Sequence, residues 1–525
     1  MRQSLLKTAV LIGLASSAQA QLWTNGDGDQ AWENGLNWDG GVVPQTGLTN
    51  INTATAGQTP IITTAVNLTA FDTFIGAGAG ASGVLDINSG GSIDTSSKWI
   101  FVGDAGGTGR INVNSGGSML SDNRIRLGDG GGAHGILNVD GGSISASQID
   151  TADTSEIHIS NGGSVTATAG NIQMRAGATA SSLNGGSMTA SGQIFIGNGG
   201  TGTAFDLNSG SMQSGAWFVV GLGGGVTGTL NMSGGTIDSS VGSGFTTIGA
   251  AGGTGVVNQT GGTWTETNKT VLGENAGGTG SYNLNGGVLQ TGAVEKGAGA
   301  ANLNFGGGTL RAGRDEANFI NASTSVVING GGGTIDSNGF NVSVNADITG
   351  AGALDKQGAG SLNLAGAGNS LDAVSVSVGT LFVSGALGTT SGIDVGAGAS
   401  IGAGDPDGGT ITGDLVINAG GTLDVTNGLL TISGGTVSFG SFGFGDIAGF
   451  DVNTAANGTY TLIAGDFILD SSNIANFGEE NALDLGGGKS AYFGAGSLTA
   501  VVVPEPGIAL LGGLGLLGLL RRRRG

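Results

Sequence analysis

The chain has 525 residues, of which 113 are glycine, only 10% are charged and none is cysteine. The high glycine content without a strict Gly-X-Y period excludes collagen, and an apolar fraction of 38% argues against simple disorder. The formal net charge of −21 argues against nucleic-acid binding, because an acidic surface repels phosphates, and the absence of cysteine excludes disulfides and thiolate metal sites.

Residues 1–20 are typical of a secretory signal peptide. Arg2 and Lys7 form a basic start, an apolar stretch follows, and Ala18-Gln19-Ala20 supplies the small residues that a signal peptidase requires. We therefore expect export, with cleavage between Ala20 and Gln21. An uncleaved N-terminal anchor is the less favoured alternative, because the apolar stretch is too short to span a bilayer.

Residues 21–49 contain three of the six tryptophans, at Trp23, Trp32 and Trp38. Terminal units of a repeat protein must cover a core that would otherwise be exposed. We predict that this segment is an N-terminal cap.

Residues 50–324 repeat a unit of roughly 24 residues in three pieces. One copy reads Leu137-Asn138-Val139, then Ser143-Ile144-Ser145 after a Gly-Gly turn, and the third piece is a short apolar strand ending in glycine, such as Ile125-Arg126-Leu127-Gly128. Alternation within each piece gives one inward and one outward face. Three short strands per unit predict an all-β fold, a parallel β-helix, expected to be right-handed, of about sixteen rungs over 50–435. A β-propeller is rejected because its blades need about 40 residues.

Residues 325–438 change the pattern. The segments 327–339, 350–366 and 378–388 contain Gly-Gly-Gly-Thr-Ile-Asp, then Leu-x-Lys-x-Gly-Ala-Gly-x-Leu-x-Leu, then Gly-Thr-Leu-x-Val, and 401–415 continues in the same style. These motifs resemble the autotransporter-associated β-strand repeat of secreted β-helical proteins. The resemblance implies that the β-helix continues, although too few residues follow for the outer-membrane barrel that often ends such chains.

Residues 439–500, rich in phenylalanine and containing Tyr460 and Tyr492, are predicted to form a C-terminal β cap.

Residues 501–525 place Pro504-Glu505-Pro506 before an uncharged run at 507–520 and the cluster Arg521, Arg522, Arg523 and Arg524. This order resembles the PEP-CTERM sorting tail of Gram-negative bacteria. The resemblance implies recognition and removal by an exosortase after transient insertion into the inner membrane. Fourteen residues of helix give roughly 21 Å, short of the ~30 Å hydrocarbon core, and the arginines favour the cytoplasmic side. A permanent tail anchor is the alternative.

The candidate catalytic side chains do not form a recognisable set. His134 and His158 are the only histidines; His134 is expected in a glycine turn and His158 at an outward position that Asn or Asp fills in other repeats. Asp94, Asp238 and Asp336 occupy equivalent positions but stand several rungs apart, whereas paired carboxyl catalysis needs a separation of ~5–10 Å. We therefore predict no catalytic residue.

The candidate ligand-binding features are equally weak. The glycine-rich turns lack the lysine and the following helix of a phosphate-binding loop. Trp99 and Trp217 share a strand position but lie five rungs apart, roughly 24 Å, so packing is favoured over a joint grip on one short oligosaccharide. No cofactor or specific metal site is predicted. The alternative is a weakly bound calcium ion held by oxygen-bearing side chains of one of two loops: Asn25, Asp27, Asp29 and Glu33, or Asp405 and Asp407.

Together these features predict an exported, non-enzymatic β-helix of the cell surface or extracellular matrix. Its expected partners are the secretion machinery, an exosortase and exopolysaccharide, the last because the sorting-tail resemblance implies an association with biofilm matrices. Two alternatives stay open. One is a carbohydrate-active β-helix, a polysaccharide lyase or glycosidase, which would need carboxylates and a basic residue clustered in one groove. The other is a passive surface-layer spacer.

Overall fold

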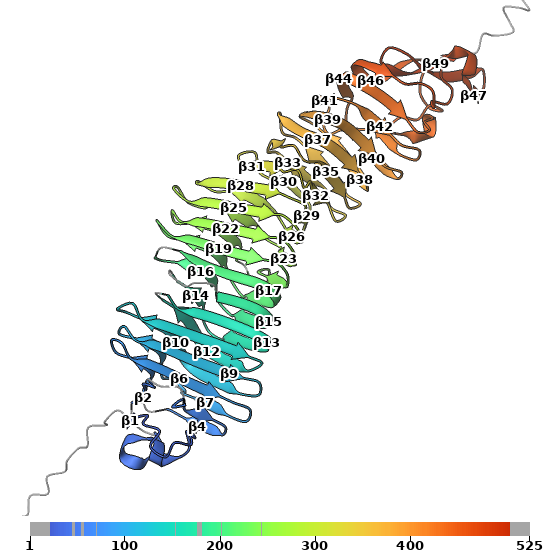
Figure 1. Cartoon of the computed structure of the whole chain (residues 1–525). Coiled ribbons are helices and arrows are strands. Elements are labelled where there is room, and N and C mark those ends of the chain that lie inside the picture. Colours follow the sequence, from blue (N-terminus) through green and yellow to red (C-terminus); the bar gives the residue numbers. More distant parts are fainter. Residues whose placement is uncertain are drawn as a thin grey trace, which may run out of the picture. The chain divides into compact units, whose positions relative to one another are not determined.

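The computed structural model describes residues 21–44, 48–53, 57–69, 71–152, 154–175, 181–200, 202–242 and 244–504. It is all-β, with 58% of residues in strands and 2% in helices, and its parallel strands form a β-solenoid of about 17 turns (Figure 1). This confirms the predicted fold class. The chain divides into two compact units: unit 1 is Met1–Ile172 with Gly177–Ser181, and unit 2 is Gln173–Ala176 with Ser182–Gly525.

Each solenoid turn contributes one strand to each of three files, as the three-piece repeat predicts, and strands that continue through a corner belong to two files. In unit 1 the first file pairs β3 (Ile61–Ile62), β6 (Ser82–Ile87), β9 (Thr108–Asn114), β11 (His134–Asp140) and β13 (Glu156–Ala167). The second pairs β4 (Ala65–Asn67), β7 (Ser92–Asp94), β10 (Ser118–Asp129), β12 (Ser143–Thr151) and the end of β13. The third pairs β1 (Gln21–Leu22), β2 (Thr49–Ile51), β5 (Thr73–Ala77), β8 (Ile100–Asp104), β10 and β12. The 3-10 helices η1 (Gly35–Asn37) and η2 (Asp39–Gly41) precede β2, and β14 (Ile172–Met174) spans the boundary between the units.

Unit 2 repeats the same three files. Its first file consists of β15 (Ser181–Ala190), β17 (Thr203–Ser214), β19 (Thr227–Met232), β22 (Thr254–Gln259), β25 (Thr279–Leu284), β28 (Ala300–Phe305), β31 (Ser325–Ile328), β34 (Ile348–Thr349), β37 (Asn369–Val376), β39 (Ala386–Val395), β41 (Gly409–Thr412), β44 (Leu430–Phe439) and β46 (Gly458–Leu469). Its second file adds β20 (Thr236–Asp238), β23 (Thr263–Glu266), β26 (Val288–Thr291), β29 (Thr309–Ala312), β32 (Gly333–Asp336), β35 (Leu354–Gln357) and β42 (Leu415–Ile417). Its third file consists of β16 (Ile194–Asn198), β18 (Phe218–Leu222), β21 (Thr246–Ala250), β24 (Thr270–Leu272), β27 (Val294–Lys296), β30 (Glu316–Ile320), β33 (Val342–Val344), β36 (Ser361–Leu364), β38 (Gly379–Val383), β40 (Ala399–Ala403), β43 (Thr422–Asp424) and β45 (Ile447–Ala448).

The interior of the solenoid is mainly apolar, with side chains stacked in register from turn to turn. Leu85, Ile111, Leu137 and Ile157 are paired from turn to turn in the first file of unit 1, and each is fully buried. Burying one such side chain contributes about 1.5–3 kcal/mol. The corners need glycine for a steric reason. Gly103, for example, has a φ of +71°, and a Cβ there would overlap the His134 carbonyl oxygen of the next turn.

The polar residue at the centre of each apolar–polar–apolar piece forms an outward amide ladder. In unit 1, Asn112 Nδ2 donates to Asp86 Oδ1 at 2.6 Å and Asn138 Nδ2 donates to Asn112 Oδ1 at 2.8 Å. In unit 2 a longer ladder links residues at the same place in successive turns with distances of 2.8 or 2.9 Å: Asp206, Asn231, Asn258, Asn283 and Asn304. The ladders explain why Asn and Asp recur at this position.

Aromatic clusters lie near the two ends of the described chain. Trp23, Trp32 and Trp38 are buried and pack edge to face, with ring centroids 5.0 and 4.6 Å apart. The 3-10 helix η3 (Phe444–Asp446) precedes β46, and η4 (Glu479–Asn481) follows it. An antiparallel sheet then joins β46 to the last three strands: β47 (Leu483–Gly486), β48 (Lys489–Gly494) and β49 (Leu498–Pro504). Phe444 and Phe493 stack there at 4.2 Å. Capping of the solenoid by these clusters stays a prediction. In the part of the chain described, no helix has the length and apolar character needed to span a bilayer.

Candidate functional site

The residues predicted for signal cleavage and sorting fall mostly outside the described ranges. These are Ala18 and Ala20 at one end and Glu505, Pro506, Arg521, Arg522, Arg523 and Arg524 at the other. Gln21 is the first residue of β1, where its backbone N–H donates to the Leu48 carbonyl oxygen at 2.7 Å. Pro504 is the last residue of β49 and is paired with Lys489 of β48. Processing at either end therefore stays a prediction.

The two histidines meet at one carboxylate on the outer surface of unit 1. His158 Nε2 is 3.0 Å from Glu156 Oε2, and His134 Nε2 is 3.7 Å from Glu156 Oε1. His158 continues the outward row of Asn138, as predicted. The prediction for His134 was wrong: it does not lie in a glycine turn but begins β11, because it pairs with Thr108 of β9. Glu156, two residues before His158 on the same strand face, was not singled out from the sequence.

The three equivalent aspartates stabilise the turns that follow their strands. The backbone N–H two residues on donates to an Oδ1 atom at 2.7 Å for Asp94, 2.9 Å for Asp238 and 2.8 Å for Asp336. This is the Asx-turn pattern. In unit 2 the strands that carry Asp238 and Asp336 are four turns apart by successive pairing. Within unit 2 the structure therefore does not bring Asp238 and Asp336 together.

The acidic loop residues considered for calcium bond to neighbouring groups. Asn34 Nδ2 donates to Asp27 Oδ2 and to Asp29 Oδ2, both at 2.8 Å. The hydrogen bond from Asn34 is the main cause that lowers the pKa of Asp29. Glu33 Oε1 accepts from the Thr64 hydroxyl at 2.7 Å, and Asp405 Oδ1 accepts from the Asp407 N–H at 3.1 Å. Across the described ranges, no three His, Asp or Glu side chains are grouped so that they could hold a metal ion.

Trp99 of unit 1 is packed on the outer surface among other side chains. Its ring stacks with Phe101 at 5.5 Å, and Phe101 in turn stacks with Phe74 at 4.9 Å. The Arg124 guanidinium lies 4.8 Å from the Trp99 ring centroid and is paired with the buried Asp150 at 3.1 Å. This arrangement fits the predicted packing role.

Trp217 of unit 2 occupies the corresponding place before β18 and is 39% exposed. Its ring lies 4.9 Å from Phe245, which precedes β21. Lys269 Nζ lies 5.2 Å from the Phe245 ring and 2.9 Å from Glu295 Oε2. The shared strand position in the sequence relates Trp217 to Trp99 of unit 1, and it did not predict the contact of Trp217 with Phe245 in the adjacent turn.

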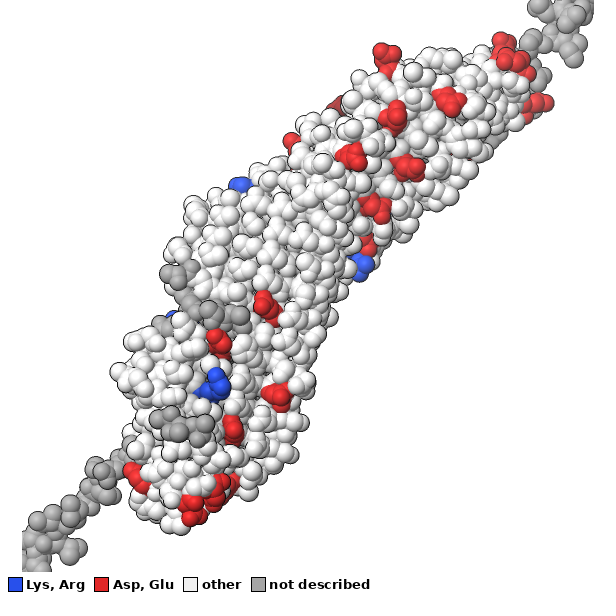
Figure 2. Space-filling model, in the orientation of Figure 1, with Lys and Arg blue, Asp and Glu red and all other residues white. Residues whose placement is uncertain are grey.

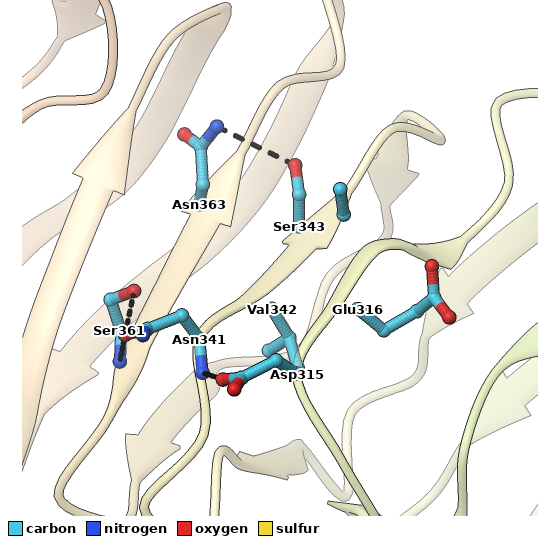
Figure 3. A pocket seen from close by; sticks show the side chains of 8 residues that line it. Asp315, Glu316, Asn341, Val342, Ser343, Ser361 and Asn363 are labelled. Atoms are coloured by element: carbon cyan, nitrogen blue, oxygen red, sulfur yellow. Dashed lines mark hydrogen bonds between the residues drawn. The ribbon is translucent and has the colours of Figure 1, made fainter.

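A shallow hollow of about 400 Å³ opens on the outer face of the third file of unit 2 (Figure 3). It is lined by Asp315, Glu316, Ala317, Asn341, Val342, Ser343, Ser361 and Asn363. Its origin is an irregularity in β30: Glu316 pairs with Val342 and Ile320 with Val344, so β30 has two more residues than β33 over the same span. Such bulges redirect side chains and often lie beside functional sites.

The hollow presents hydrogen-bonding groups of several kinds (Figure 3). Asp315 Oδ1 accepts from the Asn341 N–H at 2.7 Å, and Asn341 Oδ1 accepts from the Ser361 hydroxyl at 2.9 Å. At its edge Arg314 Nη2 pairs with Glu316 Oε2 at 2.9 Å. Carboxylate, amide and hydroxyl groups of this kind suit the hydroxyl groups of a saccharide. The hollow was missed from the sequence because its lining comes from three successive turns.

The surface drawn in Figure 2 is mostly uncharged, with scattered acidic residues and few basic ones. This agrees with the net charge of −21. The fold and the surface together define a parallel β-solenoid with a polar hollow and exposed aromatic residues on its outer face. No protein-family model, curated protein or solved structure matches the chain.

Proposed function

We propose that this chain is an exported, non-enzymatic β-solenoid of the bacterial surface or extracellular matrix, sorted by its C-terminal tail and associated with exopolysaccharide. The observation that carries the proposal is that the residues next to the two predicted processing points are paired in the sheet. Gln21, which follows the signal cleavage motif, pairs with Thr49, and Pro504, the first residue of the sorting motif, pairs with Lys489.

The pairing of β49 is compatible with tail removal. β49 lies between β46 and β48 in an antiparallel sheet, so cleavage beyond Pro504 leaves the pairings described for residues up to Pro504 in place. Cleavage within β49 would instead remove backbone hydrogen bonds from the end of the folded body.

The saccharide part of the proposal is supported by the hollow at Asp315 and Asn341. It is open, shallow and lined by polar side chains from successive turns, which suits a long polymer better than a small molecule that must be enclosed.

The test is expression of the full chain in a Gram-negative host with an exosortase and in the same host without it. The intact mass of the surface protein should correspond to a chain that begins at Gln21 and lacks Arg521 to Arg524. The protein should also sediment with the host's exopolysaccharide. Without the exosortase, or with Glu505→Gln, we expect the tail to remain. A surface protein that keeps its arginines in the presence of the exosortase would favour a permanent anchor, and failure to sediment with polysaccharide would favour a passive spacer.

A second candidate function is supported by one observation. Asp315 and Glu316 line the hollow, and Arg314 is paired with Glu316. Two carboxylates in one groove are the usual catalytic set of a glycosidase, and a basic residue beside them would suit a polysaccharide lyase. The purified protein incubated with polysaccharide should produce new reducing ends if this function holds, and Glu316→Gln should abolish them. Under the first proposal neither protein produces any.

A further inference from the structure

Two aromatic side chains and a lysine occupy matching positions in three consecutive turns of unit 2, and Glu295 of the next turn forms an ion pair with that lysine. Phe218 pairs with Thr246, Thr246 with Thr270, and Thr270 with Val294. The residue just before each of the first three strands belongs to this row: Trp217 before β18, Phe245 before β21 and Lys269 before β24. In the next turn Glu295 follows Val294 in β27. At ~4.8 Å per turn, this row runs along about 14 Å of the solenoid axis.

We propose that this row and the hollow at Asp315 form one binding track for an uncharged polysaccharide lying along the axis of unit 2. The inference rests on the proposed association with exopolysaccharide and specifies its site and the class of polymer. Sugar rings have C–H faces that pack on aromatic rings, while their hydroxyl groups bond to polar side chains. The row offers the first kind of surface and the hollow offers the second.

The two parts of the track are joined by Arg314. Its Nη1 donates to the Asn268 carbonyl oxygen at 2.8 Å and to the Thr267 carbonyl oxygen at 3.1 Å, directly before Lys269. Its Nη2 pairs with Glu316 in the hollow. By pairing, β24, β27, β30, β33 and β36 are consecutive turns of the third file, so the surface from Trp217 to the hollow follows one face of the solenoid.

The aromatic end of the track is held firmly and remains accessible. Val219 and Val271, on the strands that follow Trp217 and Lys269, are 2% and 5% exposed and provide a packed support. A Cβ at Gly244 would lie 2.6 Å from Trp217 Cδ1, so glycine at this position allows the indole to lie close against the backbone. Trp217 nevertheless keeps 39% of its surface in solvent.

The charges along the track favour a neutral polymer over an anionic one. Lys269 is paired with Glu295, and Arg314 with Glu316, so neither cation is left to neutralise a uronate or sulfate group. Asp315 adds a further carboxylate in a chain with a net charge of −21. An anionic polysaccharide would therefore meet repulsion along the track.

The test is affinity electrophoresis of the full chain in gels containing hydroxyethyl cellulose, a neutral glucan, or alginate, a polyuronate. We expect retardation by the glucan and none by alginate. Trp217→Ala and Phe245→Ala should each weaken glucan binding about tenfold or more, since a few aromatic anchors contribute most of the binding energy of an interface. The matched control is Trp99→Ala, which removes the tryptophan at the corresponding place in unit 1 and should leave binding unchanged. Circular dichroism identifies any variant that fails to fold, and Trp217→Phe should retain most of the binding.

The outcomes separate the inference from the proposed function. If neither Trp217→Ala nor Phe245→Ala weakens glucan binding, the binding track is wrong, but the proposed association with polysaccharide is not contradicted. Binding of alginate alone overturns the neutral-polymer assignment. If neither polymer retards the protein and the protein does not sediment with the host's exopolysaccharide, both the binding track and the association with exopolysaccharide are wrong.

Discussion

The ammonium group of Lys356 donates a hydrogen bond to Ser337 Oγ at 2.9 Å inside the solenoid, where both side chains are fully buried. Lys356 is the lysine of the Leu-x-Lys-x-Gly-Ala-Gly motif. Its Nζ also lies 2.8, 2.7 and 3.0 Å from the carbonyl oxygens of Gln357, Gly358 and Val378. The motif lysine thus donates to carbonyl groups that are gathered at a buried corner of the solenoid.

Lys356→Met should remove a pH dependence from the stability of the protein. Burial lowers the pKa of Lys356 from 10.5 to about 8, although Asp336 and Asp355 partly oppose this. Between pH 8 and 10.5 the unfolded chain therefore holds more protons than the folded one, so the free energy of unfolding rises with pH. The rise is at most about 3.5 kcal/mol, at about 1.4 kcal/mol per pKa unit.

Urea unfolding of both proteins at several pH values between 7.5 and 10.5 measures this effect. Wild type should become more resistant to urea across that window relative to Lys356→Met. Parallel curves for the two proteins would show that the lysine has an ordinary pKa.

Glu266→Gln should stabilise the protein at neutral pH. Glu266 is buried in β23, and burial raises its pKa above 4.5 despite hydrogen bonds from the Asn268 N–H at 2.9 Å and the Thr246 hydroxyl at 3.1 Å. The folded state therefore keeps a proton that the unfolded state has lost, and stability falls as pH rises from 4.5 through the folded pKa.

Glutamine keeps the acceptor for Asn268 and removes the buried charge, so we expect a gain on the order of 1 kcal/mol at pH 7. Thermal unfolding at pH 4 and pH 7 checks this, since the difference between the two proteins should shrink at the lower pH. A gain of equal size at both pH values would point to packing instead of charge.

The repeat period determined most of the fold, and the exceptions to it determined the candidate site. Alternation around glycine turns was sufficient to place Ile111 and Leu137 inside and Asn112 outside, because each turn copies the one before it. The hollow depends on the bulge in β30, which interrupts the copying, and on residues from three turns. Lys356 is another exception. Its charge predicts a solvent-exposed side chain, but the side chain is buried because its ammonium group donates to carbonyl groups at a corner.

His158→Asn should leave stability within about ±0.5 kcal/mol of wild type. The asparagine would lose the 3.0 Å contact with Glu156, a partly exposed pair of small value. It would gain a bond to Asn138 like the one that joins Asn138 to Asn112, because His158 and Asn138 are paired in register. Chemical denaturation at pH 7 measures the difference, and a loss of several kcal/mol would mean that the histidine has a structural role that the ladder cannot replace.

The last prediction concerns the direction of the amide ladder in unit 2. Each asparagine donates Nδ2 to the Oδ1 atom of the preceding turn: Asn231 to Asp206 at 2.8 Å, Asn258 to Asn231 at 2.9 Å and Asn283 to Asn258 at 2.8 Å. An ionised aspartate accepts but cannot donate, so it fits at the start of the ladder and not within it. Asp206 occupies such a starting place here, and Asp86 does so in unit 1.

Asn258→Asp should therefore destabilise the protein by roughly 1–2 kcal/mol, because the new carboxylate would face the Asn231 Oδ1 atom with no hydrogen between them. The reverse change at the start of the ladder, Asp206→Asn, keeps the acceptor for Asn231 and should cost less than about 0.5 kcal/mol. Both are measured by urea unfolding at pH 7. Lowering the pH to 3.5 should recover part of the loss in Asn258→Asp, since a protonated carboxyl group can donate again. Equal effects of the two substitutions would show that the ladder has no preferred direction, and that Asn and Asp alternate at this position for reasons other than hydrogen-bond polarity.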